Sequence, residues 1–187
     1  MTTKSMKKYL DSWKSIDLQK ALLVWGGLLK KAMQDAKSKG GVVYICGNGG
    51  SAANAVHIAN DFIYGSGDPR RRFDIEALPA NNSVLTCLAN DLGYDKIFSY
   101  QIENKAKPND LLIVLSGSGN SPNIIKALEA GKAKGVTTLG MLGYDGGKAK
   151  GMVDILLHAE VNDMQVAEDL QIMIAHAAVR MMDEDAE

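Results

Sequence analysis

Apolar and polar positions divide the chain into two parts that meet near residue 41. Over residues 1–40, apolar side chains recur mostly every three or four positions, which is the spacing of one face of an amphipathic helix. After residue 41, short apolar runs alternate with stretches that again have helical spacing. The pattern predicts an N-terminal helical arm followed by alternating strands and helices.

Five short apolar runs in the second part predict strands. They are Val42–Cys46, Asp74–Leu78, Leu111–Leu115, Thr137–Leu142 and Ile155–His158. Helical spacing is found at Ser51–Tyr64, Ser83–Asn90, Ser121–Lys134 and Gln165–Asp183. Strands that are apolar almost throughout and alternate with helices are typical of a mostly parallel sheet that is buried on both faces. We therefore expect one α/β domain over residues 1–187, a three-layer sandwich around a five-stranded sheet.

The predicted arm carries two tryptophans, Trp13 and Trp25, ahead of the first strand. Large apolar side chains in this position give the arm more apolar surface than one subunit can cover. Contact between copies of the chain is the natural use of such a surface. We therefore expect residues 1–40 to take part in oligomerisation.

Positive and negative charges nearly balance, with a formal net charge of −1 at pH 7 over 187 residues. Such a protein has no broad electrostatic attraction for nucleic acid or an acidic membrane, so neither is expected as a partner and any phosphate must be recognised locally. No apolar run approaches the roughly 20 residues that span a bilayer. The basic cluster Arg70–Arg72 is interpreted as a solvated loop, with a substrate or subunit contact as the alternative.

Both cysteines, Cys46 and Cys87, lie in apolar stretches, and no positively charged segment with a signal-peptide core precedes them. We expect them to be reduced thiols in the core of the protein. This cysteine usage is typical of a cytoplasmic protein.

Two loops rich in glycine and serine directly follow predicted strands, Gly47–Ser51 after the first and Ser116–Ser121 after the third. In an open α/β sheet, ligands bind beyond the carboxyl ends of the strands. Glycine lets the backbone approach a phosphate closely, and serine hydroxyls add donors without bulk. Either loop alone could be a plain turn, but two of them favour a phosphate site. The lysine and the glycine spacing of nucleotide-binding loops are missing, so a sugar phosphate is the expected ligand.

Histidines and carboxylates share helical faces at two places. His57 and Asp61 are four apart on the helix after the first loop, and Glu168 and His176 are eight apart on the last helix. Two helices could thus bring two imidazoles and two carboxylates to one point. Such a set can bind a first-row metal, zinc being the simplest choice, and can equally serve in acid/base catalysis. The alternative for His176 is a buried core histidine, and His158 is given no role.

With these loops and helical pairs, the chain resembles the phosphoheptose isomerases, also called sedoheptulose 7-phosphate isomerases, of the sugar isomerase (SIS) fold, which is flavodoxin-like. The similarity extends from the N-terminal helices to about Met182. The stretches that carry it are GNGGSAA (47–53), LANDLGY (88–94), SGSGNSPNIIKALEAGKAKG (116–135) and GYDGGK (143–148). The serine loop is common to SIS domains, whereas its combination with GNGGS and AND is narrower.

The resemblance implies an aldose-ketose isomerase, which moves a proton between C1 and C2 of a seven-carbon sugar phosphate through a cis-enediol(ate). Members of this family are homotetramers with active sites between subunits, and several bind zinc there. By position in the motifs, six residues would hold the sugar phosphate and two would lie near its hydroxyl groups. The first group is Asn48, Gly49, Ser51, Ser116, Ser118 and Ser121, and the second is Asn90 and Asp91.

The resemblance also implies roles for the two helical pairs, with four departures from the usual pattern. Asp61 replaces the usual Glu, and Glu168 the usual Gln. Gln171 stands where many members have His, and Gly117 where many have Thr. We expect Asp61 to be the base and His176 its acid/base partner, with Glu168 as the second candidate base. If zinc is bound, the expected ligands are His57, Asp61, Glu168 and His176.

Two other functions stay open at this point. The departures at Asp61 and Glu168 are compatible with an isomerase that acts on another sugar phosphate. The SIS fold also serves in non-catalytic regulators, one of which is a tetrameric partner of the bacterial replication initiator. Retention of both histidines favours catalysis over regulation.

Overall fold

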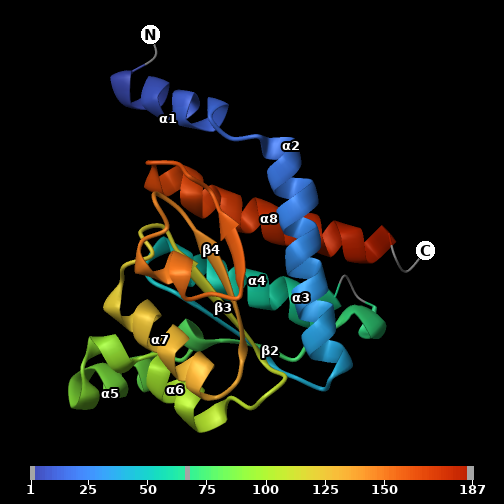
Figure 1. Ribbon diagram of the computed structural model, residues 1–187, viewed down its shortest axis with the longest axis vertical. Helices are drawn as coiled ribbons and strands as arrows, with labels where there is room; N and C mark the ends of the chain where they lie inside the picture. The colour runs from blue at the N-terminus through green and yellow to red at the C-terminus, as the bar shows by residue number, and fades with distance from the viewer. Residues whose placement is uncertain (1–2, 66–67, 185–187) are drawn as a thin grey trace.

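The computed structural model describes residues 3–65 and 68–184, and its centre is one five-stranded sheet (Figure 1). The strands lie in the order β2-β1-β3-β4-β5, and every neighbouring pair is parallel. Their bounds are β1 Val43–Gly47, β2 Ile75–Ala77, β3 Leu111–Ser116, β4 Thr137–Leu142 and β5 Ile155–His158. The predicted parallel sheet is confirmed, because each strand begins and ends within one residue of its apolar run.

One face of the sheet is covered by three helices, α3 (Gly26–Ser38), α4 (Gly50–Tyr64) and α8 (Met164–Glu184). Their apolar side chains pack on alternate residues of the central strands, such as Ile113 of β3. Because Leu29 of α3 is fully buried in this core, α3 belongs to the sandwich and is not part of a projecting arm.

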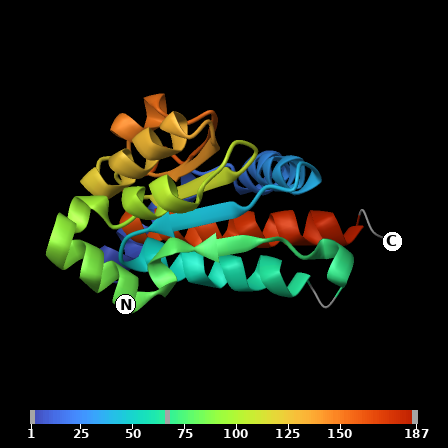
Figure 2. The same cartoon turned by 90° about the horizontal axis from the view of Figure 1, so that it is seen from below.

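The opposite face is covered by α5 (Asn82–Leu92), α6 (Ser99–Lys105) and α7 (Pro122–Ala133), which completes the predicted three layers (Figure 2). Helix α6 is not predicted by the apolar pattern. Its buried Gln101 hides the periodicity, because a polar residue stands where the pattern requires an apolar one. The Gln101 amide is satisfied by donating to the carbonyls of Ile97 and Leu78.

The N-terminal segment consists of α1 (Lys4–Lys14), α2 (Leu18–Lys20) and a short π-helical stretch, Ala21–Trp25, that continues into α3. Helix α1 lies beyond α8, on the side away from the sheet (Figure 1). The Tyr9 hydroxyl donates to Asp169 of α8 at 2.7 Å, and this bond raises the pKa of Tyr9. The side chains of Met6 and Leu10 stay half exposed, and the use of this segment in oligomerisation stays a prediction.

Short 3₁₀ turns connect the larger elements at Pro69–Arg71, Leu78–Ala80, Tyr94–Lys96 and Lys148–Gly151. At the turn Pro69–Arg71, the interpretation of the basic cluster Arg70–Arg72 as a solvated loop is wrong for Arg71. Arg71 is largely buried and donates to Asp183 of α8 at 2.7 Å, because the turn folds back against the end of that helix. Arg72 is exposed, and the side chain of Arg70 lies outside the described part of the chain.

The two cysteines differ in their surroundings. Cys46 is buried in β1 as expected, and this burial raises the pKa of its thiol. Cys87 is exposed on α5, so the expectation that it lies in the core is wrong. The apolar face of α5 is narrow, and Leu88 is its buried residue while Cys87 faces outward. Within the described residues, no helix combines the length and apolar character needed to cross a membrane.

We predict that Asp110→Ala destabilises the protein strongly. The Asp110 carboxylate is 4% exposed and accepts from the backbone N–H groups of Val42, at 2.8 Å, and Lys107, at 2.7 Å. Alanine would leave two donors without their acceptor, which lowers the free energy of unfolding by about 3 kcal/mol. Urea unfolding at fixed protein concentration measures this change.

The matched control is Asp35→Ala, whose carboxylate pairs with Lys31 on the surface of α3. An exposed pair of this kind contributes about 0.5 kcal/mol or less. Equal stability losses in the two variants would contradict the role given to Asp110.

Candidate active site

The two glycine- and serine-rich loops lie side by side at the carboxyl edge of the sheet. Strands β1 and β3 are neighbours, with Gly47 paired to Leu115, so the loops that follow them begin at the same level. The strand order reverses at this place, because β2 lies on one side of β1 and the later strands lie on the other. Such a switch point is where open α/β sheets bind their ligands. The structure thus brings both predicted phosphate loops to one crevice.

The first loop ends where α4 begins, and two glycines allow this sharp transition. A Cβ at Gly47 would come within 2.7 Å of the Ser51 carbonyl oxygen, and Gly49 has a positive φ of 56°. The residue before α4 supplies no side-chain cap, so the first N–H groups of this helix face the loop. A phosphate bound there would be stabilised by these donors and by the helix dipole.

Ser51 is held in place by a polar chain that the sequence analysis did not anticipate. Its hydroxyl is nearly fully buried and accepts from the Gln171 amide at 3.2 Å. The Gln171 oxygen in turn accepts from Asn54 at 2.9 Å. Gln171, at a position where many family members have His, therefore connects α8 with the start of α4.

The second loop uses part of its serines to hold its own shape. The Ser116 hydroxyl accepts from the Gly119 backbone at 3.0 Å, and the Ser118 hydroxyl accepts from the Asn120 backbone at 3.3 Å. Ser121 stands just before α7 and makes no side-chain cap bond, which leaves its hydroxyl available to a ligand. Gly119 has a positive φ of 64°, and a Cβ there would overlap the Gly146 carbonyl.

A cavity of about 610 Å³ adjoins this loop and is bordered by Ser118 and Asn120 on one side. Tyr144 and Met164 form part of its apolar wall. The same two side chains approach Gly117, where a Cβ would overlap the Met164 side chain. The end of the Met164 side chain thus occupies the space beside Gly117, where many family members have Thr.

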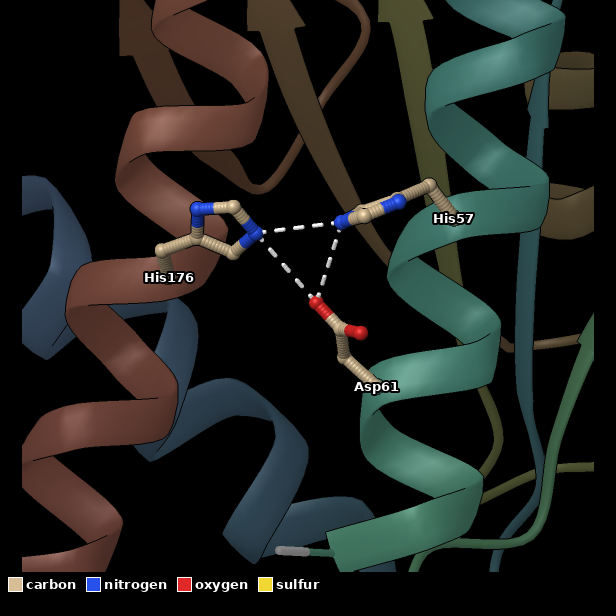
Figure 3. Close-up of side chains that lie close together, drawn as sticks. All are labelled: His57, Asp61 and His176. Carbon is tan, nitrogen blue, oxygen red and sulfur yellow. Dashed lines mark hydrogen bonds and ion pairs between the residues drawn. The ribbon is translucent and has the colours of Figure 1, made fainter.

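Three of the predicted acid/base and metal residues meet between α4 and α8 (Figure 3). The Nε2 atoms of His57 and His176 are 3.1 Å apart, and Asp61 Oδ2 lies 3.3 Å from each of them. Both imidazoles are about half exposed, with side-chain values of 50% and 49%, while Asp61 is at 25%. A substrate or an ion can therefore reach this cluster from solvent.

Glu168 lies apart from these three residues. Its carboxylate rests against Gly50 at the N-terminus of α4, where a Cβ would overlap it. Within the described chain, the His, Cys, Asp and Glu side chains that gather closely enough to hold a metal are His57, Asp61 and His176. Glu168 thus faces the first phosphate loop, and its place is close to the expected phosphate.

The remaining sequence candidates lie at the margin of the crevice or outside it. Asn90 and Asp91 are exposed near the end of α5 and are joined by a hydrogen bond of 2.7 Å. Tyr94, three residues further, donates to Asn48 in the first loop at 3.0 Å and so brings this segment to the site. His158, which was given no role, bonds to the Tyr144 carbonyl at 3.0 Å.

Comparison with known proteins gives one consistent result. The family model described as SIS domain matches residues 28–143. The phosphoheptose isomerase of Fusobacterium nucleatum is 42% identical over 76% of this chain and 73% of its own length. The phosphoheptose isomerase of Clostridium acetobutylicum is 36% identical over 96% of both chains.

Solved structures agree with the sequence relatives. The phosphoheptose isomerase of Neisseria gonorrhoeae superposes with a TM-score of 0.84 at 29% identity, covering 94% of this chain and 95% of its own. That of Francisella tularensis has a TM-score of 0.87 at 25% identity, covering 98% and 100%. With its paired glycine- and serine-rich loops and its imidazole-carboxylate cluster, the chain belongs to the phosphoheptose isomerase family of SIS-domain enzymes.

Proposed function

We propose that the protein interconverts sedoheptulose 7-phosphate and D-glycero-D-manno-heptose 7-phosphate through an enediol(ate). The observation that carries this proposal is the position of the imidazole-carboxylate cluster along the helix that starts at the first phosphate loop. His57 is seven residues from Gly50, and at the rise of an α-helix this separates the two by about 10 Å. An extended seven-carbon sugar spans a similar length between its phosphate and its carbonyl end.

Isomerisation requires a base at carbon and an acid at oxygen. Starting from the aldose, a base removes the proton from C2 while a second group gives a proton to the carbonyl oxygen at C1. The enediol then receives a proton at C1 as the oxygen on C2 loses its own, which leaves the ketone. Asp61, which lies beside both imidazoles, is the proposed base, and His176 is its acid/base partner. Glu168 stays the second candidate base, although its carboxylate rests against Gly50 and apart from this cluster.

The cluster also suits a divalent metal. Two imidazole nitrogens and one carboxylate oxygen are the donors that zinc takes in catalytic sites, and these atoms lie within 4.8 Å of one another. We propose His57, Asp61 and His176 as zinc ligands, a role that competes with that of Asp61 as base; Glu168 stays a prediction as a fourth ligand. When bound, the ion would polarise the sugar oxygens and stabilise the enediolate.

We further propose a homotetramer in the cytoplasm. Exposed apolar side chains support an assembly of copies, because single subunits rarely leave such residues in solvent together. They are found on α1, on the segment before α3 and on α4, as Met6, Leu10, Leu23, Val24, Val56 and Ile63.

Asp61→Asn is expected to lower kcat for sedoheptulose 7-phosphate by about 10²–10⁴-fold, because the amide cannot accept the carbon-bound proton. The matched control, Asp35→Asn, changes an exposed carboxylate on α3 and should leave kcat as it is. Coupled detection of the aldose product measures both. An Asp61→Asn enzyme with unchanged turnover would remove Asp61 from the role of base.

Zinc binding is tested separately from activity. His176→Ala removes one of three proposed ligands and is expected to weaken zinc affinity by at least about 100-fold. The control His158→Ala removes a histidine that bonds to a backbone carbonyl and should retain the affinity of the unaltered protein. Competition with a chromophoric chelator, followed by elemental analysis, reports the bound metal. Equal zinc affinity in the two variants would contradict the proposed ligand set.

A panel of pentose, hexose and heptose phosphates tests the substrate. The departures at Asp61 and Glu168 support a second candidate, an isomerase for a different sugar phosphate. We expect the heptose to be turned over with the highest kcat/KM. Turnover confined to a shorter sugar would favour the second candidate. The third possibility, a non-catalytic SIS-domain regulator, has no support from the isomerase relatives.

A further inference from the structure

The two phosphate loops are joined by a reciprocal pair of side-chain amides. The Asn48 nitrogen donates to the Asn123 oxygen at 2.9 Å, and the Asn123 nitrogen donates to the Asn48 oxygen at 2.8 Å. Asn48 belongs to the first loop, and Asn123 lies in the first turn of α7, directly after the second loop. The pair therefore spans the crevice between the ends of β1 and β3.

Asn123 is buried in the protein interior, with an exposed fraction of 1%. A buried amide needs partners, since leaving its donors and acceptor unpaired is costly. Asn48 is the side chain that meets this need through two hydrogen bonds at once. The orientation of the Asn48 amide is consequently set by a residue that is itself shielded from solvent.

Tyr94 adds a third contact from the outer side. Its hydroxyl donates to the Asn48 oxygen at 3.0 Å, although the Tyr94 side chain is 61% exposed. The next residue, Asp95, forms an ion pair with Lys126 of α7, and the hydrogen bond from this lysine lowers the pKa of Asp95. Lys126 follows Asn123 by three residues, so one face of α7 supports both partners of Asn48.

The contacts leave one group of Asn48 available. Its oxygen accepts from Asn123 and Tyr94, and one of its two N–H bonds is used by Asn123. Across the residues that the structure describes, the second N–H has no protein acceptor. It is held at the switch point of the sheet, where the sugar phosphate is expected.

We propose that Asn123 is a positioning residue for substrate binding, which orients the Asn48 amide so that its second N–H donates to the bound sugar phosphate. Tyr94 completes this arrangement by holding the Asn48 oxygen. The inference rests on the proposed isomerase function, because it assigns Asn48 to the substrate. Asn123 acts through Asn48, and it does not touch the reacting atoms.

A double-mutant cycle tests the proposal with the full-length protein and sedoheptulose 7-phosphate. Asn48→Ala and Asn123→Ala are each expected to raise KM about tenfold with kcat changed less than about threefold, since a neutral hydrogen bond to substrate is lost. The combination of both is expected to raise KM no further than Asn48→Ala alone. A merely structural role of Asn123 would lower the thermal stability and leave the KM of the folded enzyme unchanged.

Tyr94→Phe is a second variant, and it is expected to fold normally because Tyr94 is on the surface. It removes a single hydroxyl and should raise KM about threefold, but not in the Asn48→Ala background. Tyr100→Phe is its matched control on α6, and Asn104→Ala is the control for a lost asparagine; both should retain the KM of the unaltered enzyme. If Asn123→Ala does not fold, the Tyr94→Phe cycle decides alone.

The outcomes separate the two proposals. An unaltered KM in Asn123→Ala or, where that variant does not fold, in Tyr94→Phe would overturn the inference and leave the isomerase function intact. KM increases that multiply in the double variants would also overturn it, because they would show action independent of Asn48. No turnover or binding of any sugar phosphate by the unaltered protein would overturn both.

Discussion

The direct pairing of β1 with β3 is the constraint on which the site depends. These strands are 68 residues apart at their starts, Val43 and Leu111, and yet they lie next to each other in the sheet. Because β2 was placed on the other side of β1, no helix or strand separates the two loops that follow β1 and β3. Backbone donors, serine hydroxyls and the beginnings of α4 and α7 therefore gather around one small volume.

A second contact, between α4 and α8, brings the imidazole-carboxylate cluster together. His57 and Asp61 share a face of α4 because they are one helical turn apart, but His176 comes from the far end of the sequence. Between these groups and the phosphate loops, the Asn54 and Gln171 amides bond across the same helix pair. The helix interface is thus polar where it borders the site and apolar where it borders the sheet, with Ile58 and Leu170 in the core.

Much of the fold could be predicted because strands buried on both faces appear as uninterrupted apolar runs, as at Leu111–Leu115. Helix α6 could not, since its buried Gln101 breaks the periodicity. Sequence spacing along one helix also predicted that His57 and Asp61 lie together. It could not place Glu168 against Gly50 or pair Asn48 with Asn123, because these contacts depend on the rotation of helices and the path of loops between residues far apart in the chain.

Gly50 has a consequence for the contact between α4 and α8. It carries no side chain, so the Glu168 carboxylate can rest directly on the α4 backbone, while the Asn54 amide donates to the Glu168 carbonyl at 2.9 Å. A side chain at position 50 would meet this carboxylate first. The place of the Glu168 carboxylate, directly beside the turn between β1 and α4, therefore depends on a residue without a Cβ at the start of α4.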